Sequence, residues 1–203
     1  LLLASTHGDR FGCYRDAPER IVNTFHFMKQ LFSLLFLLMG SFVMAQEAVN
    51  PAIKSFGTVS TVPNADVTPD PSQTYNIVAD VMSGGEDHSE VFFSLNNVAR
   101  LVNLHTMAGA PQENLNVVVA VHNAAMWSVL SNEAHQKRFK TSNPHEPLIE
   151  ELLNYGVKIV VCGQSLVKRN VSKDDLLPGV EVATSALTVL TEYQLMGYAL
   201  LRF

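Results

Sequence analysis

Residues 158–165 read KIVVCGQS, an apolar run that ends at Cys162 and passes at once into a Gly-Gln-Ser turn. A short apolar run of this kind is typical of a buried parallel strand whose end leads into a loop or helix. In open α/β sheets, ligands bind at the carboxyl ends of such strands. Cys162 is therefore the first residue to consider for chemistry.

Further apolar runs predict strands, and helical patterns separate them along the chain. The alternation predicts an α/β fold, a five-stranded parallel sheet with helices on both faces. Right-handed crossovers place the carboxyl end of every strand at one edge of that sheet. The predicted strands cover residues 75–82, 115–122, 158–162, 180–184 and 198–203.

The predicted helices carry start and stop signals. Asp87 or Ser89 is available as a cap for the first helix, and Ser185 for the last. The third predicted helix has a proline in its first turn and Gly156 just past its end. The four predicted helices cover residues 91–102, 124–139 (interrupted), 147–155 and 185–196.

The chain of 203 residues divides into four segments. Residues 1–27 precede Met28, and we interpret them as an upstream stretch outside the native protein. Residues 28–45 combine a positive start, a short interrupted apolar run and small residues, which predicts a cleaved signal peptide or, as the alternative, an uncleaved N-terminal anchor. Residues 46–74 contain four prolines and predict a flexible arm, and residues 75–203 form the folded domain.

These segments predict a protein exported to the periplasm, with no stable membrane insertion after cleavage and no indication of a lipid anchor. From Gln46 onward there are 10 Lys and Arg against 16 Asp and Glu, a net charge of −6. This balance argues against nucleic acid as a partner, and the small run of Lys137, Arg138 and Lys140 is read as a solvated face. Cys162 is the one cysteine in this part, so its thiol is free, paired between subunits or modified.

Cys162 and His122 are the candidate catalytic residues. A helix starting after Cys162 would lower the pKa of its thiol and favour the nucleophilic thiolate, and Gly163 would let a substrate approach the backbone. The alternative is that Cys162 is a small buried hydrophobe. His122 ends its strand as a proton donor or cationic partner, or as a structural histidine bonded to a carbonyl. The segments expected to meet at this edge are residues 83–88, 122–124, 162–165 and Ser185.

The loop over residues 83–88 reads SGGEDH and lacks the spacing of the glycine-rich nucleotide motifs. A turn followed by a helix cap is the better interpretation. Asp87 and His88 do not have metal-ligand spacing with each other or with His122, so neither a metal nor another cofactor is predicted.

Residues 75–203 resemble the DsrE/DsrF-like family. The resemblance implies a flavodoxin-like α/β fold, assembly as trimers or hexamers and, in some branches, relay of sulfur as a cysteine persulfide at the position of Cys162. Many relatives have glycine after the strand-end histidine, so Asn123 implies a narrower pocket here. The segments that carry the resemblance are VVAVH (118–122), NP (143–144), LIEEL (148–152), GV (156–157), VCGQS (161–165), LPGV (177–180), SA (185–186) and QLMGY (194–198).

The leading hypothesis is an exported protein that carries sulfane sulfur on Cys162, with a sulfur donor or acceptor protein as partner. The ligand-binding residues expected around the thiol are Asn123, Gly163, Gln164, Ser165 and Ser185. The alternative is a non-catalytic oligomeric module that binds a small ligand or a protein at the same strand ends. A third hypothesis is a structural role in which the arm over residues 46–74 tethers or swaps between subunits. Whether the protein is an enzyme stays open.

Overall fold

The computed structural model describes Lys29 and residues 47–203. The predictions for residues 1–27 and, apart from Lys29, for the signal segment 28–45 lie outside the described residues. Among the residues that are described, no helix combines the length and the apolar character needed to cross a membrane.

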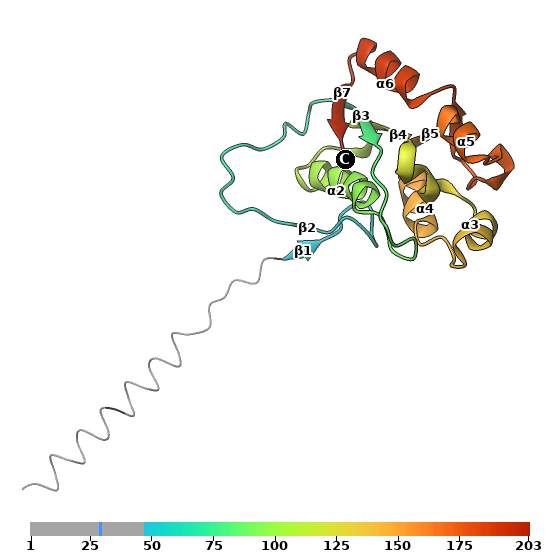
Figure 1. Cartoon of the computed structure of the whole chain (residues 1–203). Coiled ribbons are helices and arrows are strands. Elements are labelled where there is room, and N and C mark those ends of the chain that lie inside the picture. The colour runs from blue at the N-terminus through green and yellow to red at the C-terminus, as the bar shows by residue number, and fades with distance from the viewer. Residues whose placement is uncertain (1–28, 30–46) are drawn as a thin grey trace, which may run out of the picture. The chain divides into compact units, whose positions relative to one another are not determined.

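The central feature is a five-stranded sheet in which every neighbouring pair is parallel (Figure 1). Its order is β6-β5-β4-β3-β7, so four strands follow one another across the sheet and the last returns to the opposite edge beside β3. The predicted α/β fold is confirmed, and each predicted strand is present. The strands are β3 (Tyr75–Val81), β4 (Leu115–Val121), β5 (Lys158–Cys162), β6 (Glu181–Ala183) and β7 (Ala199–Arg202).

The two faces of the sheet are buried by different helices. Alternate side chains of the central strands, such as Val119 and Val161, pack into one core with α2 (Phe93–Met107) and α4 (Glu146–Tyr155). The intervening side chains form a smaller core with α6 (Ala186–Leu195), which contacts all five strands. Cys162 belongs to this smaller core. Because both faces of the central strands β3, β4 and β5 are covered, these strands are apolar at consecutive positions.

Most predicted helix boundaries are confirmed. The interrupted segment is a 3-10 helix, η2 (Asn123–Val129), followed by α3 (Asn132–Phe139). Gly156 ends α4 with a φ of 105°, a left-handed conformation suited to glycine. Ser185 caps α6 by accepting the Leu187 N–H. The remaining short elements are η1 (Gln112–Asn114), α5 (Gly163–Arg169) and η3 (Lys173–Asp175).

The expected cap of α2 is wrong. Phe92 stands at the N-cap position, and no side chain there accepts a bond from the helix. Asp87 and Ser89, the predicted caps, bond to each other instead. The N–H of Phe92 donates to His145 Nε2 at 2.9 Å, so a distant side chain satisfies the start of this helix.

The first part of the segment expected to be a flexible arm packs against the domain. Strands β1 (Ala48–Val49) and β2 (Val59–Ser60) form an antiparallel pair. Between them Ile53 is 1% exposed and belongs to the larger core. The side-chain amide of Asn103 on α2 bonds the backbone around Ile53, which holds the segment in place. Residues 61–74 are exposed and form the long loop that stands away from the sheet in Figure 1.

Candidate functional site

Cys162 is both the last residue of β5 and the N-cap of α5. The apolar strand carries the chain to the sheet edge, and Gly163 allows the helix to start there. A Cβ atom at Gly163 would lie 2.6 Å from the carbonyl oxygen of Ala183, at the end of β6. Glycine is therefore required for this close approach, which brings the ends of β5 and β6 together.

Hydrogen-bond donors from two helices surround the Cys162 sulfur. Burial by itself raises the pKa of the thiol, but several donors lower it, and the net pKa lies below the ordinary value for cysteine. The donors are the N–H of Ala186 at the start of α6, the hydroxyl and N–H of Ser165, and the N–H of Gln164. Each of these groups favours the ionised sulfur, so the site stabilises a thiolate.

Two serines link the thiol to the neighbouring loops. Ser185 Oγ lies 4.0 Å from Cys162 Sγ and accepts the Leu187 N–H that begins α6. Ser165 Oγ accepts the Asn123 N–H at 3.1 Å. Of the predicted site residues, Ser165 and Ser185 therefore lie beside the thiol, and Asn123 is linked to it through Ser165.

Asn123 and Gln164 form the outer part of the site. Asn123 has a φ of 52°, in the left-handed region that glycine favours and asparagine tolerates. Its side-chain oxygen accepts a bond from the Arg169 guanidinium at 3.2 Å. The Gln164 amide donates to the Thr184 carbonyl at 3.4 Å. Both side chains are exposed. The partner of Gln164 is a backbone carbonyl and that of Asn123 is a guanidinium group, so neither bond is to the thiol.

His122 forms a hydrogen bond with a carboxylate, that of Asp80, which the sequence analysis did not predict. Its Nε2 lies 2.6 Å from Asp80 Oδ1, so Nε2–H donates to the carboxylate and fixes the ring. The other oxygen of Asp80 lies 3.6 Å from Arg202 Nε. Asp80 is 9% exposed and stands inside the apolar strand β3. A carboxylate within such a run was the signal that could have identified it, because a buried charge needs a partner.

His122 and Cys162 lie at the same level on adjacent strands. Val121 pairs with Val161, so the residues that come next, His122 just after β4 and Cys162 at the end of β5, lie at the same level of the sheet edge. Neighbouring strands are about 4.8 Å apart. The imidazole of His122 bonds Asp80 on β3, the strand on the other side of β4 from Cys162. The carboxyl edge therefore carries a row of thiol, imidazole, carboxylate and guanidinium across four strands.

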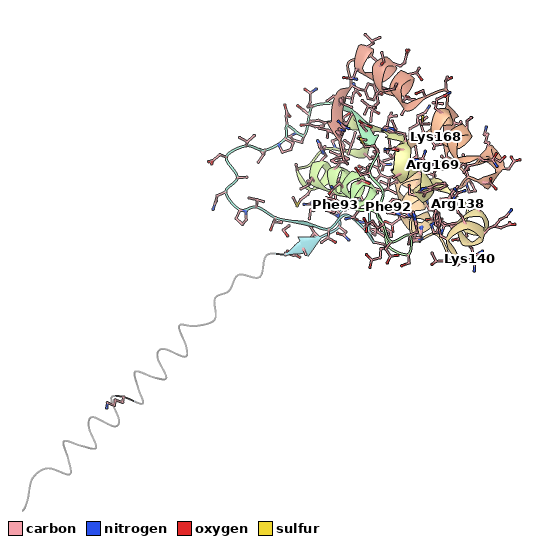
Figure 2. All side chains as sticks on the ribbon, viewed as in Figure 1. Phe92, Phe93, Arg138, Lys140, Lys168 and Arg169 are labelled. Atoms are coloured by element: carbon pink, nitrogen blue, oxygen red, sulfur yellow. The ribbon has the colours of Figure 1, made fainter. Side chains whose placement is uncertain are left out.

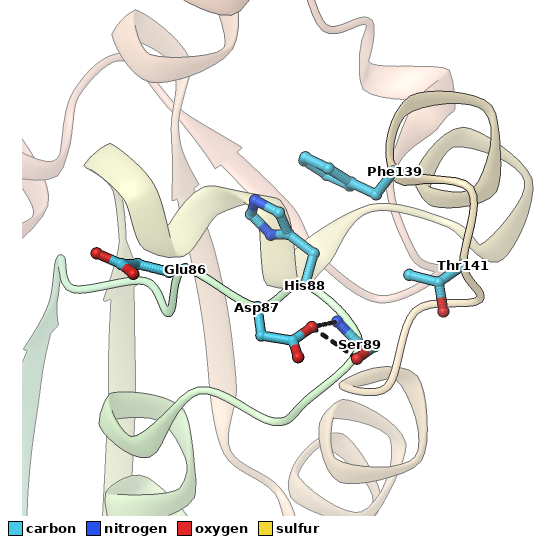
Figure 3. A pocket seen from close by; sticks show the side chains of 6 residues that line it. All are labelled: Glu86, Asp87, His88, Ser89, Phe139 and Thr141. Atoms are coloured by element: carbon cyan, nitrogen blue, oxygen red, sulfur yellow. Dashed lines mark hydrogen bonds between the residues drawn. The ribbon is translucent and has the colours of Figure 1, made fainter.

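The loop over residues 83–88 contributes less than expected. Asp87 accepts from the hydroxyl and N–H of Ser89, and these bonds lower the pKa of the carboxyl. His88 stacks on Phe139 with ring centroids 3.7 Å apart (Figure 3). The hollow in Figure 3 also includes Thr141. Within the described part of the chain, no three His, Cys, Asp or Glu side chains are grouped to hold a metal ion.

Comparison with known proteins gives a family match. A model of the DsrE/DsrF-like family matches residues 76–203. The structure is similar to the protein of unknown function MTH1491 from Methanobacterium thermoautotrophicum, with 23% identity over 64% of this chain and 99% of that one and a TM-score of 0.49. It is also similar to the ychN protein from E. coli, with 22% identity, the same coverage and a TM-score of 0.48. None of the curated proteins matches the chain.

Proposed function

The chain belongs to the DsrE/DsrF-like family, and from this premise we propose that it carries sulfane sulfur as a persulfide on Cys162. The family suggests a role of the sulfur-relay type. The observation that carries the proposal is the set of donors from α5 and α6 around Cys162 Sγ, which lowers the pKa of the thiol despite its burial. A thiolate is the form of cysteine that attacks sulfur.

The proposed reaction needs no outside oxidant. The Cys162 thiolate attacks the outer sulfur of a persulfide or polysulfide donor, a new S–S bond forms at Cys162, and the donor's S–S bond breaks. The donor thiolate leaves with the electron pair and takes a proton. In the second step an acceptor thiolate attacks the outer sulfur on Cys162, and the Cys162 thiolate is the leaving group.

His122 is proposed to handle the proton. With Nε2–H donated to Asp80, the neutral ring keeps a lone pair on Nδ1 that can accept a proton and return it. Asp80 is then a positioning residue, because its bond to Nε2–H fixes the orientation of the ring. Asp80 is itself neighboured by Arg202.

The same edge supplies the proposed ligand-binding residues. Gly163 lets the ends of β5 and β6 come together beside the thiol, and Ser165 and Ser185 present hydroxyls beside the sulfur. Asn123 and Gln164 lie further out, where the carboxyl ends of β4 and β5 meet solvent. We assign them the role of shaping the entrance for the donor and acceptor molecules.

Export is a further part of the proposal, supported by the signal-like sequence of residues 28–45. Expression of the chain from Met28, where the signal-like segment begins, in a Gram-negative host should give a periplasmic protein that begins at Gln46. Amino-terminal sequencing of the periplasmic fraction tests this. A cytoplasmic protein with its first residues intact would contradict export.

Assembly into a trimer or hexamer is also proposed, and exposed apolar side chains on the α6 side of the sheet support it. Leu187 and Leu195 on α6 are 73% and 82% exposed, and Met196 is 60% exposed. On the edge strand β7, Leu200 pairs with Val78 of the α6 core, so it faces the same side, and it is 43% exposed. Exposed apolar side chains grouped on one side of a domain mark sites of protein association.

Intact mass after sulfur loading tests the central reaction. The chain from Gln46 onward, in which Cys162 is the one cysteine, is treated with polysulfide, desalted and weighed beside Cys162→Ser. We expect one added sulfur atom on the native chain, removed by a thiol acceptor, and none on the variant. An adduct of equal yield on Cys162→Ser would contradict the proposal.

A second candidate is a non-catalytic module that binds a ligand or protein at these strand ends. The observation that favours it is the burial of Cys162, whose residue is 5% exposed. Alkylation of the native protein separates the two. A thiol protected until the protein unfolds supports the module, and a thiol that reacts in the native state supports sulfur transfer.

A further inference from the structure

Five cations from two elements gather on one part of the surface, which we call the basic surface. Lys137 and Arg138 lie on α3, Lys140 follows it, and Lys168 and Arg169 end α5. Figure 2 labels four of the five, on the α3 and α5 side of the domain.

Trp127 joins the two groups of cations. The Arg138 guanidinium carbon lies 4.0 Å from the centroid of the indole, and that of Arg169 lies 5.6 Å from it. Two guanidinium groups thus share one aromatic ring. Trp127, Arg138 and Arg169 are apart in the sequence, and the fold brings them together.

Within the described residues, none of the five charges of this surface is paired with a carboxylate. None of the five cations forms an ion pair there. They are half of the 10 Lys and Arg from Gln46 onward, in a segment whose net charge is −6. Gathering like charges in an acidic protein costs free energy that an anionic partner would offset.

A hollow of about 220 Å³ lies within the basic surface. Its lining is mixed: Leu130, Ala134 and Val171 form the apolar part, and Lys137, Arg138, Asn170 and Asp175 form the polar part. Asp175 is the only carboxylate among its lining residues, and it accepts the Ser172 N–H in a local capping box.

We propose that the basic surface docks an acidic segment of a partner protein, with an apolar side chain of that segment in the hollow. A small oxyanion would satisfy one or two cations and leave the apolar lining open. A peptide that alternates carboxylates with an apolar residue matches both the charge and the lining. This inference does not depend on sulfur chemistry.

The docked segment would lie near the thiol site. Arg169 donates to Asn123, whose N–H donates to Ser165 beside the sulfur. Arg169 is the seventh residue after Cys162, about 10 Å along a helix. A partner held at the basic surface is thereby placed beside the carboxyl edge of the sheet.

Trp127 is the single tryptophan of the chain and serves as the reporter. The full chain is titrated with a short tryptophan-free peptide of glutamates around a central leucine, and tryptophan fluorescence and calorimetry are followed. Saturable binding that weakens with salt is expected. The Lys137→Gln/Lys168→Gln variant, which leaves both arginines on the indole, should bind about fivefold to tenfold more weakly.

Lys54→Gln/Arg100→Gln is the matched control, because it removes the same charge from exposed residues elsewhere. It should bind the peptide as the native chain does. Equal weakening in the control would overturn the proposal. So would an equal response to inorganic sulfate, which would indicate a small-anion site, or stronger binding to phosphatidylglycerol vesicles than to the peptide, which would indicate a lipid surface.

Discussion

The sulfur of Cys162 owes its proposed reactivity to a few named donors. Burial opposes ionisation of the thiol, and the N–H groups of Ala186, Ser165 and Gln164 favour it together with the Ser165 hydroxyl. The pKa of the thiol therefore depends on the N-terminal ends of two helices, α5 and α6, which both lie at the sulfur atom. Each side-chain donor can be removed by substitution, and its effect on the pKa of the Cys162 thiol can be measured.

Ser165→Ala should raise the pKa of the Cys162 thiol, because it removes one hydroxyl donor and keeps the backbone. The rate of alkylation by iodoacetamide, followed against pH for the Cys162 peptide by mass spectrometry, measures the change. Loss of the acceptor for the Asn123 N–H should also cost about 1 kcal/mol of stability. Ser172→Ala, on an exposed residue that caps η3, is the control and should leave the thiol unchanged.

Asp80→Asn should slow sulfur loading of Cys162 by about tenfold, because the charged acceptor that holds His122 is lost. Nitrogen NMR of the His122 ring should show a changed tautomer, which a structural role alone would not require. Asp70→Asn, in the exposed loop, is the control. Unchanged loading with an altered His122 ring would remove His122 from the mechanism.

The residues around the thiol could be predicted from the sequence because they stand next to one another or begin a helix. Cys162, Gly163, Gln164 and Ser165 are consecutive, and Ser185 follows a strand. Asp80 could not be assigned to His122 in the same way. Its partner depends on which strands are neighbours, and the order β6-β5-β4-β3-β7 is a property of the fold.

At the scale of elements, the strands and helices form where the apolar patterns of the sequence predicted them. The structure differs from the prediction where contacts between distant residues replace local capping and turn signals. The α2 helix has no side-chain cap because Phe92, at the N-cap position, has no acceptor in its side chain, and the Phe92 N–H is bonded by His145, far along the chain. The segment between β1 and β2 packs against α2 because the buried side-chain amide of Asn103 forms hydrogen bonds with its backbone. Asn103 accepts from the N–H groups of Ala52 and Ile53.

Asn103→Ala should release the segment between β1 and β2 from α2. The side-chain Nδ2 also donates to the carbonyls of Phe56 and Gly57, so several buried backbone groups would lose their partner. The free energy of unfolding should fall by roughly 2–4 kcal/mol. Hydrogen exchange should speed up around Ile53, and Asn97→Ala, on the same helix, should change neither measurement.

At the scale of the whole molecule, buried histidines make stability depend on pH. Burial lowers the pKa of His145 to about 3, with help from the charges of His135 and His88. The unfolded chain, with a pKa of 6.5 for this residue, takes up the proton first. Stability is therefore complete above that value and is lost as pH falls toward the folded pKa.

The free energy of unfolding should accordingly fall by roughly 1 kcal/mol per pH unit between about pH 6 and about pH 4. Urea titrations at several pH values measure this slope. Proton NMR should show a His145 ring that does not titrate in the same interval. A His145 ring that titrates near its unfolded value would contradict the assignment.

Assembly is tested by changing the exposed face of α6. Leu187→Asp/Leu195→Asp should convert the expected trimer or hexamer into a monomer, because two apolar side chains of the association surface become charged. Light scattering of the full chain measures the mass. Val167→Asp, on α5 and 78% exposed, is the control and should leave the assembly intact.

The pKa of the Cys162 thiol tests the account most directly. The ultraviolet absorbance of the thiolate is followed against pH for the native full chain, and the curve of Cys162→Ser is subtracted to remove Cys13. The donors at the starts of α5 and α6 predict a pKa below the ordinary value of 9.0. A value at or above 9.0 would identify Cys162 as a buried packing residue and contradict the proposed sulfur carrier.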